Sequence, residues 1–403
     1  MRKGKGMTLM AIVLAAMVLV AGCAGGGKAP DKAKGPIKIG VITSRSGPLE
    51  YYGTMEIRGL ELGIDYATGG KREALGRKIE ILVEDDTGDP GVGVQKARKL
   101  LESDQVDILQ GSASSGVALA IQKLAPQYKK VFVVEPAAAD SITGQNFNRY
   151  TFRTGSNVSQ DALAGGKYVA RQLGKTFVHL APDYAWGRES AAAWKRALEG
   201  EGGKVIAEVF APLNTTDFTP YLEKVVAAKP EVLVVSWAGS GAVKLFEQIR
   251  EQGLYKKMRV TTSFGDSRSL QAMGDAAVGL VGVSKYAYTL PKNPVNDWLI
   301  KAHQEKYQEP PDIFTAGGFA AGVAIVEGLK KAGSTDAEAL IQAMEGMSFE
   351  TPKGTMTFRR EDHQALQPMY VAEMVKDAAG KPVLKLLQEM SAQETAPPVN
   401  VPK

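Results

Sequence analysis

Short apolar runs alternate with amphipathic stretches over most of the chain, and this alternation predicts the fold. In residues 37–134 it predicts strands at 37–42, 78–84, 106–109 and 131–134, and helices at 52–68, 92–103 and 117–128. After a break near residues 153–158 it restarts, with helices at 162–173, 190–199, 221–228 and 242–252 and strands at 176–180, 204–210, 231–236 and 259–262. β-Branched runs separated by helices are typical of βαβ units. We therefore expect an α/β protein with two Rossmann-like parallel-sheet lobes.

The last third of the chain does not continue this alternation. It predicts a strand at 281–286, helices at 295–307, 314–332 and 336–347, and two late strands at 354–358 and 369–375. A chain that returns to its first lobe after completing the second would give this order. We therefore assign residues 37–154 and 287–352 to lobe 1, and residues 155–286 and 353–390 to lobe 2. Three hinge crossings are expected, near Arg153–Asn157, Lys285–Leu290 and Glu350–Gly354.

The N-terminus has the pattern of an export signal. Residues 2–5 include three basic side chains, and residues 7–22 are uncharged and too short for a comfortable membrane-spanning helix. The stretch Leu-Val-Ala-Gly-Cys that ends at Cys23 resembles the lipobox of bacterial lipoproteins, in which the cysteine is acylated. We expect a signal peptide at 1–22, a lipidated tether at 23–36 and a flexible tail at 391–403. The alternatives are a plain secretory signal and an uncleaved membrane anchor.

Composition narrows the functional classes. Apolar residues make up 44% and charged residues 23% of the 403 residues, as in ordinary globular proteins, and the length suits two domains. The formal charge of +5 is small and basic residues alternate with acidic ones, so nucleic-acid binding gains no support. The single cysteine excludes an intramolecular disulfide. We expect a lipid-anchored monomer outside the cytoplasm, with no cofactor.

A loop of serines and small residues follows the strand at 106–109. Open α/β sheets bind ligands at the carboxyl ends of their strands. Ser114 and Ser115 lie at such an end, where a helix begins. Hydroxyl groups and backbone N–H groups at a helix start bind a carboxylate well. The alternative is an ordinary serine N-cap, and the loop lacks the Gly-Lys-Ser/Thr of a P-loop.

Several short motifs together resemble one known family, the leucine/isoleucine/valine class of type I periplasmic solute-binding proteins. The motifs are spread from Ile37 to about Leu387: Ser46-Gly47-Pro48 with Tyr52-Gly53, Glu84-Asp85-Asp86 with Asp89-Pro90, Gly111 to Ser115, Pro136-Ala137-Ala138, Arg153-Thr154 and Trp186-Gly187. The resemblance implies the type I periplasmic-binding-protein fold. It also implies a small-molecule ligand that is delivered to the permease and ATPase subunits of an ABC importer.

The same resemblance implies roles for individual residues. Ser115 matches the serine that holds the carboxylate of the ligand. Ala137 matches the residue whose carbonyl group meets the ligand's ammonium group. Tyr52 and Trp186 match aromatic positions that wall the pocket from the two lobes. We therefore expect a ligand that touches both lobes and stabilises their closed arrangement by hinge closure.

Two positions depart from the family pattern. Ala139, next to Ala138 in the loop, stands where branched-chain binders have a threonine. The glutamate that binds the ammonium group in the second lobe is either replaced by Asp266 or absent. A small apolar or branched-chain amino acid, or a similar carboxylate, is the expected ligand.

Aromatic residues gather at strand ends and first helical turns on the expected binding edge. They are Tyr51, Tyr52, Tyr184, Trp186 and Trp237. Such residues predict a flat apolar pocket wall, and packing within the lobes is the alternative. An aromatic or other non-amino carboxylate, or a small amide, then competes with the amino acid as the ligand.

An enzyme is the rival class of protein. His179, His303 and His363 are scattered, and none pairs in the sequence with a nucleophile. The chain has no Gly-x-Ser-x-Gly, His-Glu-x-x-His or Cys-x-x-Cys motif, and its acidic runs lack the spacing of a calcium loop. We therefore expect no catalysis and no metal site. A sensor subunit that presents its bound ligand to a receptor would have the same sequence features.

Overall fold

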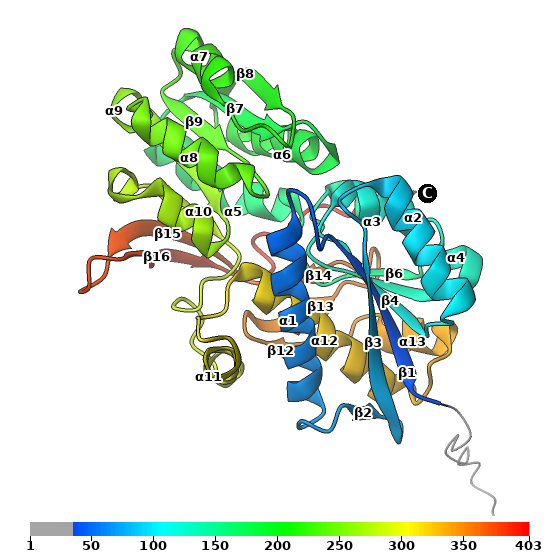
Figure 1. The fold of residues 1–403 in the computed structure, drawn as a ribbon. Helices are drawn as coiled ribbons and strands as arrows, with labels where there is room; N and C mark the ends of the chain where they lie inside the picture. Colours follow the sequence, from blue (N-terminus) through cyan, green and yellow to red (C-terminus); the bar gives the residue numbers. More distant parts are fainter. Residues whose placement is uncertain (1–34, 403) are drawn as a thin grey trace, which may run out of the picture.

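A computed structural model of the protein describes residues 35–402, and its chain forms two α/β lobes (Figure 1). The predicted signal peptide at 1–22 and Cys23 lie outside the described residues. Lobe 1 contains a six-stranded sheet in the order β2-β3-β1-β4-β5-β6. Its strands are β1 (Ile37–Thr43), β2 (Glu73–Ala74), β3 (Arg77–Asp85), β4 (Ile108–Gly111), β5 (Val131–Val134) and β6 (Thr151–Arg153).

Helices cover both faces of this sheet because its central strands are apolar on both sides. On β1, Ile39 and Val41 face α1 (Glu50–Ala67) and α12 (Ile313–Ala332), whereas Ile42 faces the opposite core. That opposite core is formed with α2 (Pro90–Arg98), α3 (Ser115–Gln122) and α4 (Ala125–Tyr128). The helices α11 (Pro294–Tyr307) and α13 (Ala337–Met344) complete lobe 1.

Lobe 2 is built around a seven-stranded sheet in the order β16-β15-β11-β10-β9-β7-β8. The parallel strands are β7 (Thr176–Pro182), β8 (Lys204–Ala211), β9 (Val232–Val235), β10 (Arg259–Phe264) and β11 (Val281–Ser284). The strands β15 (Met369–Lys376) and β16 (Pro382–Met390) add to it antiparallel. The lobe's helices are α5 (Val158–Gln172), α6 (Ala185–Gly200), α7 (Thr219–Ala228), α8 (Gly241–Glu251), α9 (Leu254–Lys257) and α10 (Ser267–Met273).

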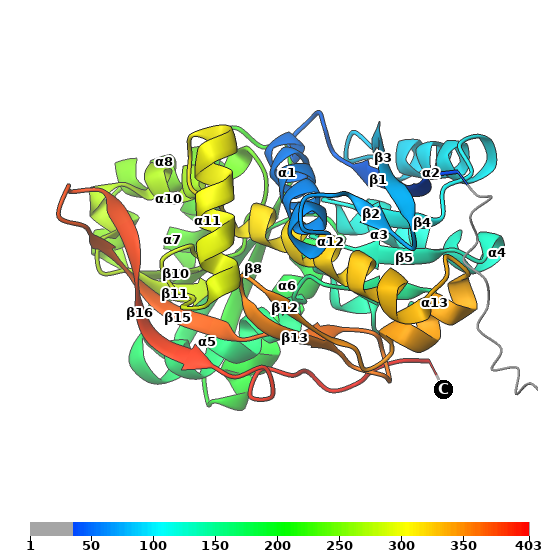
Figure 2. The same cartoon turned by 90° about the horizontal axis from the view of Figure 1, so that it is seen from below.

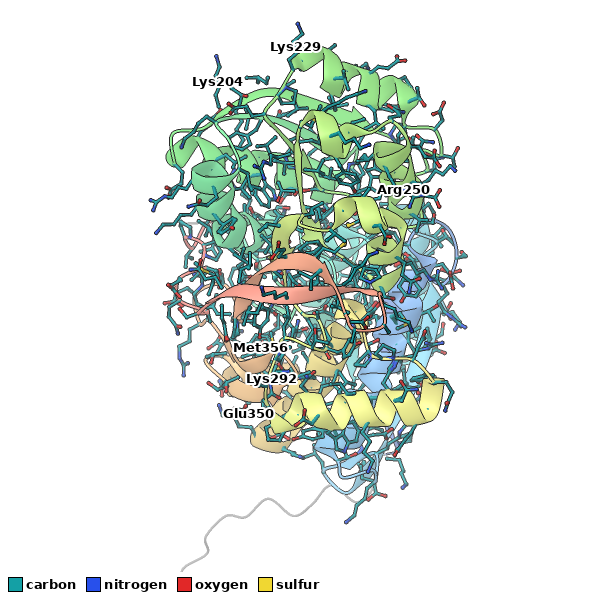
Figure 3. The ribbon with its side chains drawn as sticks, turned by 90° about the vertical axis from the view of Figure 1, so that its left-hand side faces the viewer. Lys204, Lys229, Arg250, Lys292, Glu350 and Met356 are labelled. Carbon is teal, nitrogen blue, oxygen red and sulfur yellow. The ribbon has the colours of Figure 1, made fainter. Side chains whose placement is uncertain are left out.

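The third passage between the lobes lies later than expected. The strands β12 (Ser348–Thr351) and β13 (Gly354–Phe358) form an antiparallel hairpin, which β14 (Ala365–Leu366) extends. Phe349 and Met356 of this hairpin are buried in the lobe 1 core, and Figure 3 shows Met356 in the half of the molecule away from Lys204. Residues 353–366 therefore belong with lobe 1 and not with lobe 2, because the hairpin buries its apolar face there.

The C-terminal segment is packed against the protein, contrary to the expectation of a flexible tail at 391–403. It leaves β16 in lobe 2 and runs to lobe 1 (Figure 2). Thr395 is fully buried, and the Arg359 guanidinium donates a hydrogen bond of 2.7 Å to the Pro397 carbonyl. Residues 391–402 therefore form a further link between the lobes.

Glycines allow α1 and α12 to pack with their backbones in contact. A Cβ atom at Gly59 would lie 2.0 Å from the Thr315 carbonyl oxygen, and one at Gly63 would lie 2.2 Å from the Phe319 carbonyl oxygen. Gly318 on α12 meets the Glu56 carbonyl oxygen in the same way, at 2.0 Å. The helix α12 is long and apolar enough to cross a membrane, yet packing of this kind buries most of it in the core of lobe 1. This contact fixes the N-terminal ends of α1 and α12 beside the boundary between the two lobes.

Candidate functional site

A cavity of about 80 Å³ lies where the two lobes meet. This volume suits a small solute, since pockets for drug-sized ligands are roughly 300–1,000 Å³. Both lobes and the segments between them line it. The lining residues are Tyr52, Ala113, Ser115, Pro136, Ala137, Ala138, Asp161, Tyr184, Trp186, Ser236, Trp237, Ala238, Ser263, Phe264, Gly265, Lys285, Ile313 and Phe314.

Ser115 is positioned as a hydrogen-bond donor to this cavity. It is the first residue of α3, and its hydroxyl oxygen accepts a 3.2 Å hydrogen bond from the backbone N–H of Ala139. Accepting this bond leaves the hydroxyl hydrogen available for an acceptor, and within residues 35–402 the hydroxyl donates to no protein group. Ser114, by contrast, does not line the cavity: it is the N-cap of α3, and its hydroxyl oxygen accepts from the Val117 N–H at 3.5 Å. The sequence predicted that both serines contact the ligand. In the structure only Ser115 lines the cavity, whereas Ser114 caps α3.

The loop that follows β5 forms the neighbouring wall. Ala137 and Ala138 line the cavity, whereas Ala139 lies behind them and orients Ser115. Arg153 is fully buried beneath this loop and donates hydrogen bonds to the Ala139 carbonyl and, at 2.6 Å, to the Gln364 side chain. Burial lowers the pKa of Arg153 to about 10, so the guanidinium stays charged at neutral pH. Arg153 thus ties the loop to the hinge.

Aromatic side chains from both lobes enclose the apolar part of the cavity. Tyr52 of α1 stacks on Phe314 of α12, with ring centroids 3.8 Å apart. Tyr184 and Trp186 pair from lobe 2, with centroids 6.1 Å apart, and Trp237 follows β9. These four predicted aromatics all line the cavity, whereas Tyr51 does not.

Hydrogen bonds join the lobes across the mouth of the cavity. The Gly239 N–H of lobe 2 donates to the Tyr52 hydroxyl of lobe 1 at 2.8 Å. The Ser240 N–H donates to the Pro48 carbonyl at 2.8 Å. The Tyr51 and Ser267 hydroxyls lie 3.3 Å apart at the same edge. The lobes therefore stand closed over the cavity in this structure.

Asp266 does not take the place predicted for it. It is the N-cap of α10, where its two carboxylate oxygens accept from the Ser269 N–H at 3.0 Å and from the Ser269 hydroxyl at 2.8 Å. It does not line the cavity. An aspartate that follows a strand and precedes a helix is a typical N-cap, and this explains the placement.

An ion pair that the sequence did not indicate, between buried Asp161 and partly buried Lys285, lines the cavity instead. The Lys285 ammonium lies 3.0 Å from Oδ2 of Asp161, whose Oδ1 accepts from the Ser156 hydroxyl at 3.2 Å. Burial raises the pKa of Asp161, while the Lys285 charge opposes that rise. The two residues are far apart in the sequence, and the only signal for them was their position beside the predicted hinge crossings.

One histidine does approach a hydroxyl group at the cavity. His179 Nε2 lies 2.9 Å from the Ser236 hydroxyl, which also accepts from Ser190 at 2.8 Å. Burial lowers the pKa of His179 to about 3, so the ring is uncharged and a poor base at neutral pH. The pair therefore lacks the basicity that activates a serine nucleophile. Among residues 35–402, no cluster of three His, Cys, Asp or Glu side chains suits a metal ion.

A larger cavity of about 530 Å³ lies beside the C-terminal segment, away from the serine loop. Its charged lining residues are paired with protein partners. Asp140 accepts from the Ser159 N–H at 3.0 Å, and Glu189 accepts from the Ser141 hydroxyl at 2.6 Å. The smaller cavity holds the Ser115 hydroxyl and the aromatic wall, so it is the better candidate for a specific ligand.

Comparison with known proteins agrees with this two-lobed site. The family model described as "Periplasmic binding protein" matches residues 36–381. The chain belongs to this family. A leucine-, isoleucine-, valine-, threonine- and alanine-binding protein of Pseudomonas aeruginosa is 28% identical, over 93% of this chain and 98% of that protein.

Solved structures in the family resemble the chain over most of its length. The crystal structure of an ABC-type branched-chain amino acid transporter protein from Rhodopseudomonas palustris is 41% identical, with a TM-score of 0.77, and covers 91% of this chain and 100% of that one. A solute-binding protein from the same species, solved in complex with 3,4-dihydroxybenzoic acid, is 28% identical, with a TM-score of 0.83, covering 89% and 98%.

These findings confirm the fold and the general function predicted from the sequence. The periplasmic binding protein has the type I two-lobed fold. It is a solute-binding protein of the leucine/isoleucine/valine class, located outside the cytoplasm, and works with the permease and ATPase of an ABC transporter. It is a binding protein and not an enzyme.

Proposed function

We propose that this binding protein captures a small carboxylate between its lobes, and that an apolar or branched-chain amino acid is its principal ligand. The observation that supports this most directly is the free hydroxyl hydrogen of Ser115, at the start of α3 and inside an aromatic-walled cavity. A hydrogen bond to a charged carboxylate contributes about 1.5–3 kcal/mol. The aromatic rings then bury the apolar part of the ligand, and closure shields both.

Aromatic carboxylates are the second candidate. The support is the stacked Tyr52 and Phe314 together with Trp186 and Trp237, which offer flat apolar surfaces. Two Rhodopseudomonas palustris solute-binding proteins with related folds were solved in complex with 3,4-dihydroxybenzoic acid and with benzoate. A hydroxybenzoate would place its carboxylate at Ser115 and its ring between the aromatic walls.

We also propose that the mature protein is a monomer held at the membrane by a lipid on Cys23. The lipobox-like residues 19–23 and the short tether before Ile37 support the lipid anchor. A Cys23→Ala variant tests it by cell fractionation. The wild-type protein should be in the membrane fraction and the variant in the soluble one, and an unchanged distribution would contradict the anchor.

A ligand panel tests the proposed capture of a carboxylate. The purified protein without its first 34 residues is heated with branched-chain amino acids, alanine, hydroxybenzoates and small amides, and each shift in melting temperature is confirmed by calorimetry. Ligands that bind the native state raise its melting temperature. We expect carboxylates to do so and amides to have no effect. A protein stabilised by amides alone would refute carboxylate capture.

A further inference from the structure

Asp86 is a buried acidic residue that the ligand contacts leave unexplained. It follows β3, is fully buried and does not line the cavity. Burying a carboxylate is costly unless hydrogen bonds satisfy it. Three donors do so: the Ser44 hydroxyl at 2.6 Å, the Gly88 N–H at 2.8 Å and the Ser112 hydroxyl at 2.5 Å. The carboxylate is therefore held in one orientation.

The groups joined by Asp86 come from the ends of three neighbouring strands. In the lobe 1 sheet β3, β1 and β4 lie side by side and run parallel, so their carboxyl ends form one edge. Asp86 follows β3, Ser44 follows β1 and Ser112 follows β4. One side chain thus connects the loops after three parallel strands, at the edge where an open α/β sheet binds its ligand.

Ser112 extends this connection to the ligand-facing loops. Its hydroxyl oxygen accepts the Ser114 N–H at 3.2 Å, and its carbonyl oxygen accepts the Ala137 N–H at 3.1 Å. Ser114 is the N-cap of α3, whose first residue is Ser115, and Ala137 lines the cavity. Two successive hydrogen bonds therefore link Asp86 to the start of the helix that presents Ser115.

The loop after β1 is held by the same carboxylate. A Cβ atom at Gly53 would lie 2.0 Å from the Ser44 carbonyl oxygen, so α1 packs directly on this loop. Gly53 follows Tyr52, which lines the cavity. Asp86 therefore fixes two lobe 1 parts of the site relative to each other, the aromatic wall on α1 and the hydroxyl group on α3.

We propose that Asp86 is a positioning residue for ligand binding, and that it acts through Ser112 to hold Ser115 where a carboxylate can reach it. This rests on the proposed capture of a carboxylate and adds the group that orients the capturing serine. Because Asp86 does not line the cavity, it acts without contacting the ligand. The proposal also gives a role to the last residue of the acidic run at 84–86.

The test replaces Asp86 with Asn, which keeps the size and exchanges one acceptor oxygen for an NH₂ donor. The Gly88 N–H can only donate, so it retains the Asn carbonyl oxygen and turns the NH₂ group toward Ser112. Calorimetry measures the binding of leucine, or of 4-hydroxybenzoate if leucine does not bind. We expect Asp86→Asn to weaken binding roughly fivefold or more, because the hydrogen bond that orients Ser112 is reversed.

The same substitution in Ser115→Ala separates a positioning role from a structural one. In that background the contact that Asp86 positions is already absent, so Asp86→Asn should weaken binding no further. A residue that only stabilises the fold would weaken binding by the same factor in both backgrounds. Where thermal melting shows that Asp86→Asn does not fold, Ser112→Ala breaks the same hydrogen bond from the other side and should show the same dependence on Ser115.

The matched control is the neighbouring aspartate, Asp85. Its carboxylate accepts from the Arg45 N–H at 2.8 Å and from the Ser46 hydroxyl at 2.7 Å, both at the surface, whereas Ser112 donates to Asp86. Asp85→Asn makes the same chemical change on the adjacent residue. It should bind the carboxylate as tightly as the wild-type protein does.

The outcomes distinguish this proposal from carboxylate capture. Equal weakening in both Ser115 backgrounds, or an unchanged dissociation constant in a folded Asp86→Asn protein, would overturn the role of Asp86 and leave the capture standing. An unchanged dissociation constant in Ser115→Ala would overturn the capture at Ser115, and this proposal with it.

Discussion

At the scale of single residues, the proposed function depends most on the Ser115 hydroxyl. Replacing Ser115 with Ala removes the hydrogen that is free to bind a carboxylate, and with it the hydrogen bond that positions the Ala139 N–H. The loss of one charge-assisted hydrogen bond, about 1.5–3 kcal/mol, weakens binding by roughly tenfold or more. Calorimetry with the best ligand of the panel measures this change. An unchanged dissociation constant in a folded variant would show that the carboxylate is bound elsewhere.

The sequence indicated some residues of the site and could not indicate others. Ser115 was predictable because loops at the carboxyl ends of parallel strands converge, whatever the details of packing, and Ala137 because of the resemblance to the family. Asp161 and Lys285 were not, since their meeting depends on how two hinge segments from distant parts of the chain fold together. Asp266 was misplaced because a capping aspartate and a ligand-binding aspartate have the same sequence signature.

At the scale of elements, the contact of α1 with α12 sets the position of the aromatic wall. A methyl group at Gly63 would lie 2.2 Å from the Phe319 carbonyl oxygen, so the helices would have to move apart. Overpacking of this kind typically costs about 1–3 kcal/mol. We expect Gly63→Ala to lower the melting temperature and to weaken ligand binding, because Tyr52 and Phe314 are carried by these two helices.

A matched glycine controls for the substitution itself. Gly200, the last residue of α6, has open space where a Cβ would stand, so Gly200→Ala should leave melting unchanged or raise it slightly. Equal melting temperatures of Gly63→Ala and the wild-type protein would show that the helices are not held by this close contact.

Elements were predictable where burial makes their sequence apolar. The strands β5 and β13 coincide with the predicted ranges 131–134 and 354–358. The edge strand β16 was not predicted, because most of its residues are exposed and give no apolar run. The strand β12 was not predicted either, so its pairing with β13 was missed as well. Because this hairpin was not foreseen, the third hinge crossing was predicted too early, at Glu350–Gly354.

At the scale of the whole molecule, the lobes are joined at the hinge and also by the C-terminal segment. The family model ends at residue 381, yet residues 391–402 continue to lobe 1 and end beside Arg359 and the larger cavity. The composition of residues 391–403, rich in proline and small residues, predicted a flexible tail. Composition does not show whether a segment packs against the rest of the protein. The two lobes close over the small cavity, so the proposed ligand binding and hinge closure take place at the same site.

The central claim is that a carboxylate is held at Ser115 inside this cavity. A crystal structure of the protein with the carboxylate that stabilises it most tests this claim directly. We predict a carboxylate oxygen within about 3 Å of the Ser115 hydroxyl, with the rest of the ligand between Tyr52 and Trp237. A ligand found instead in the larger cavity beside residues 140–145 and 397–400 would contradict it.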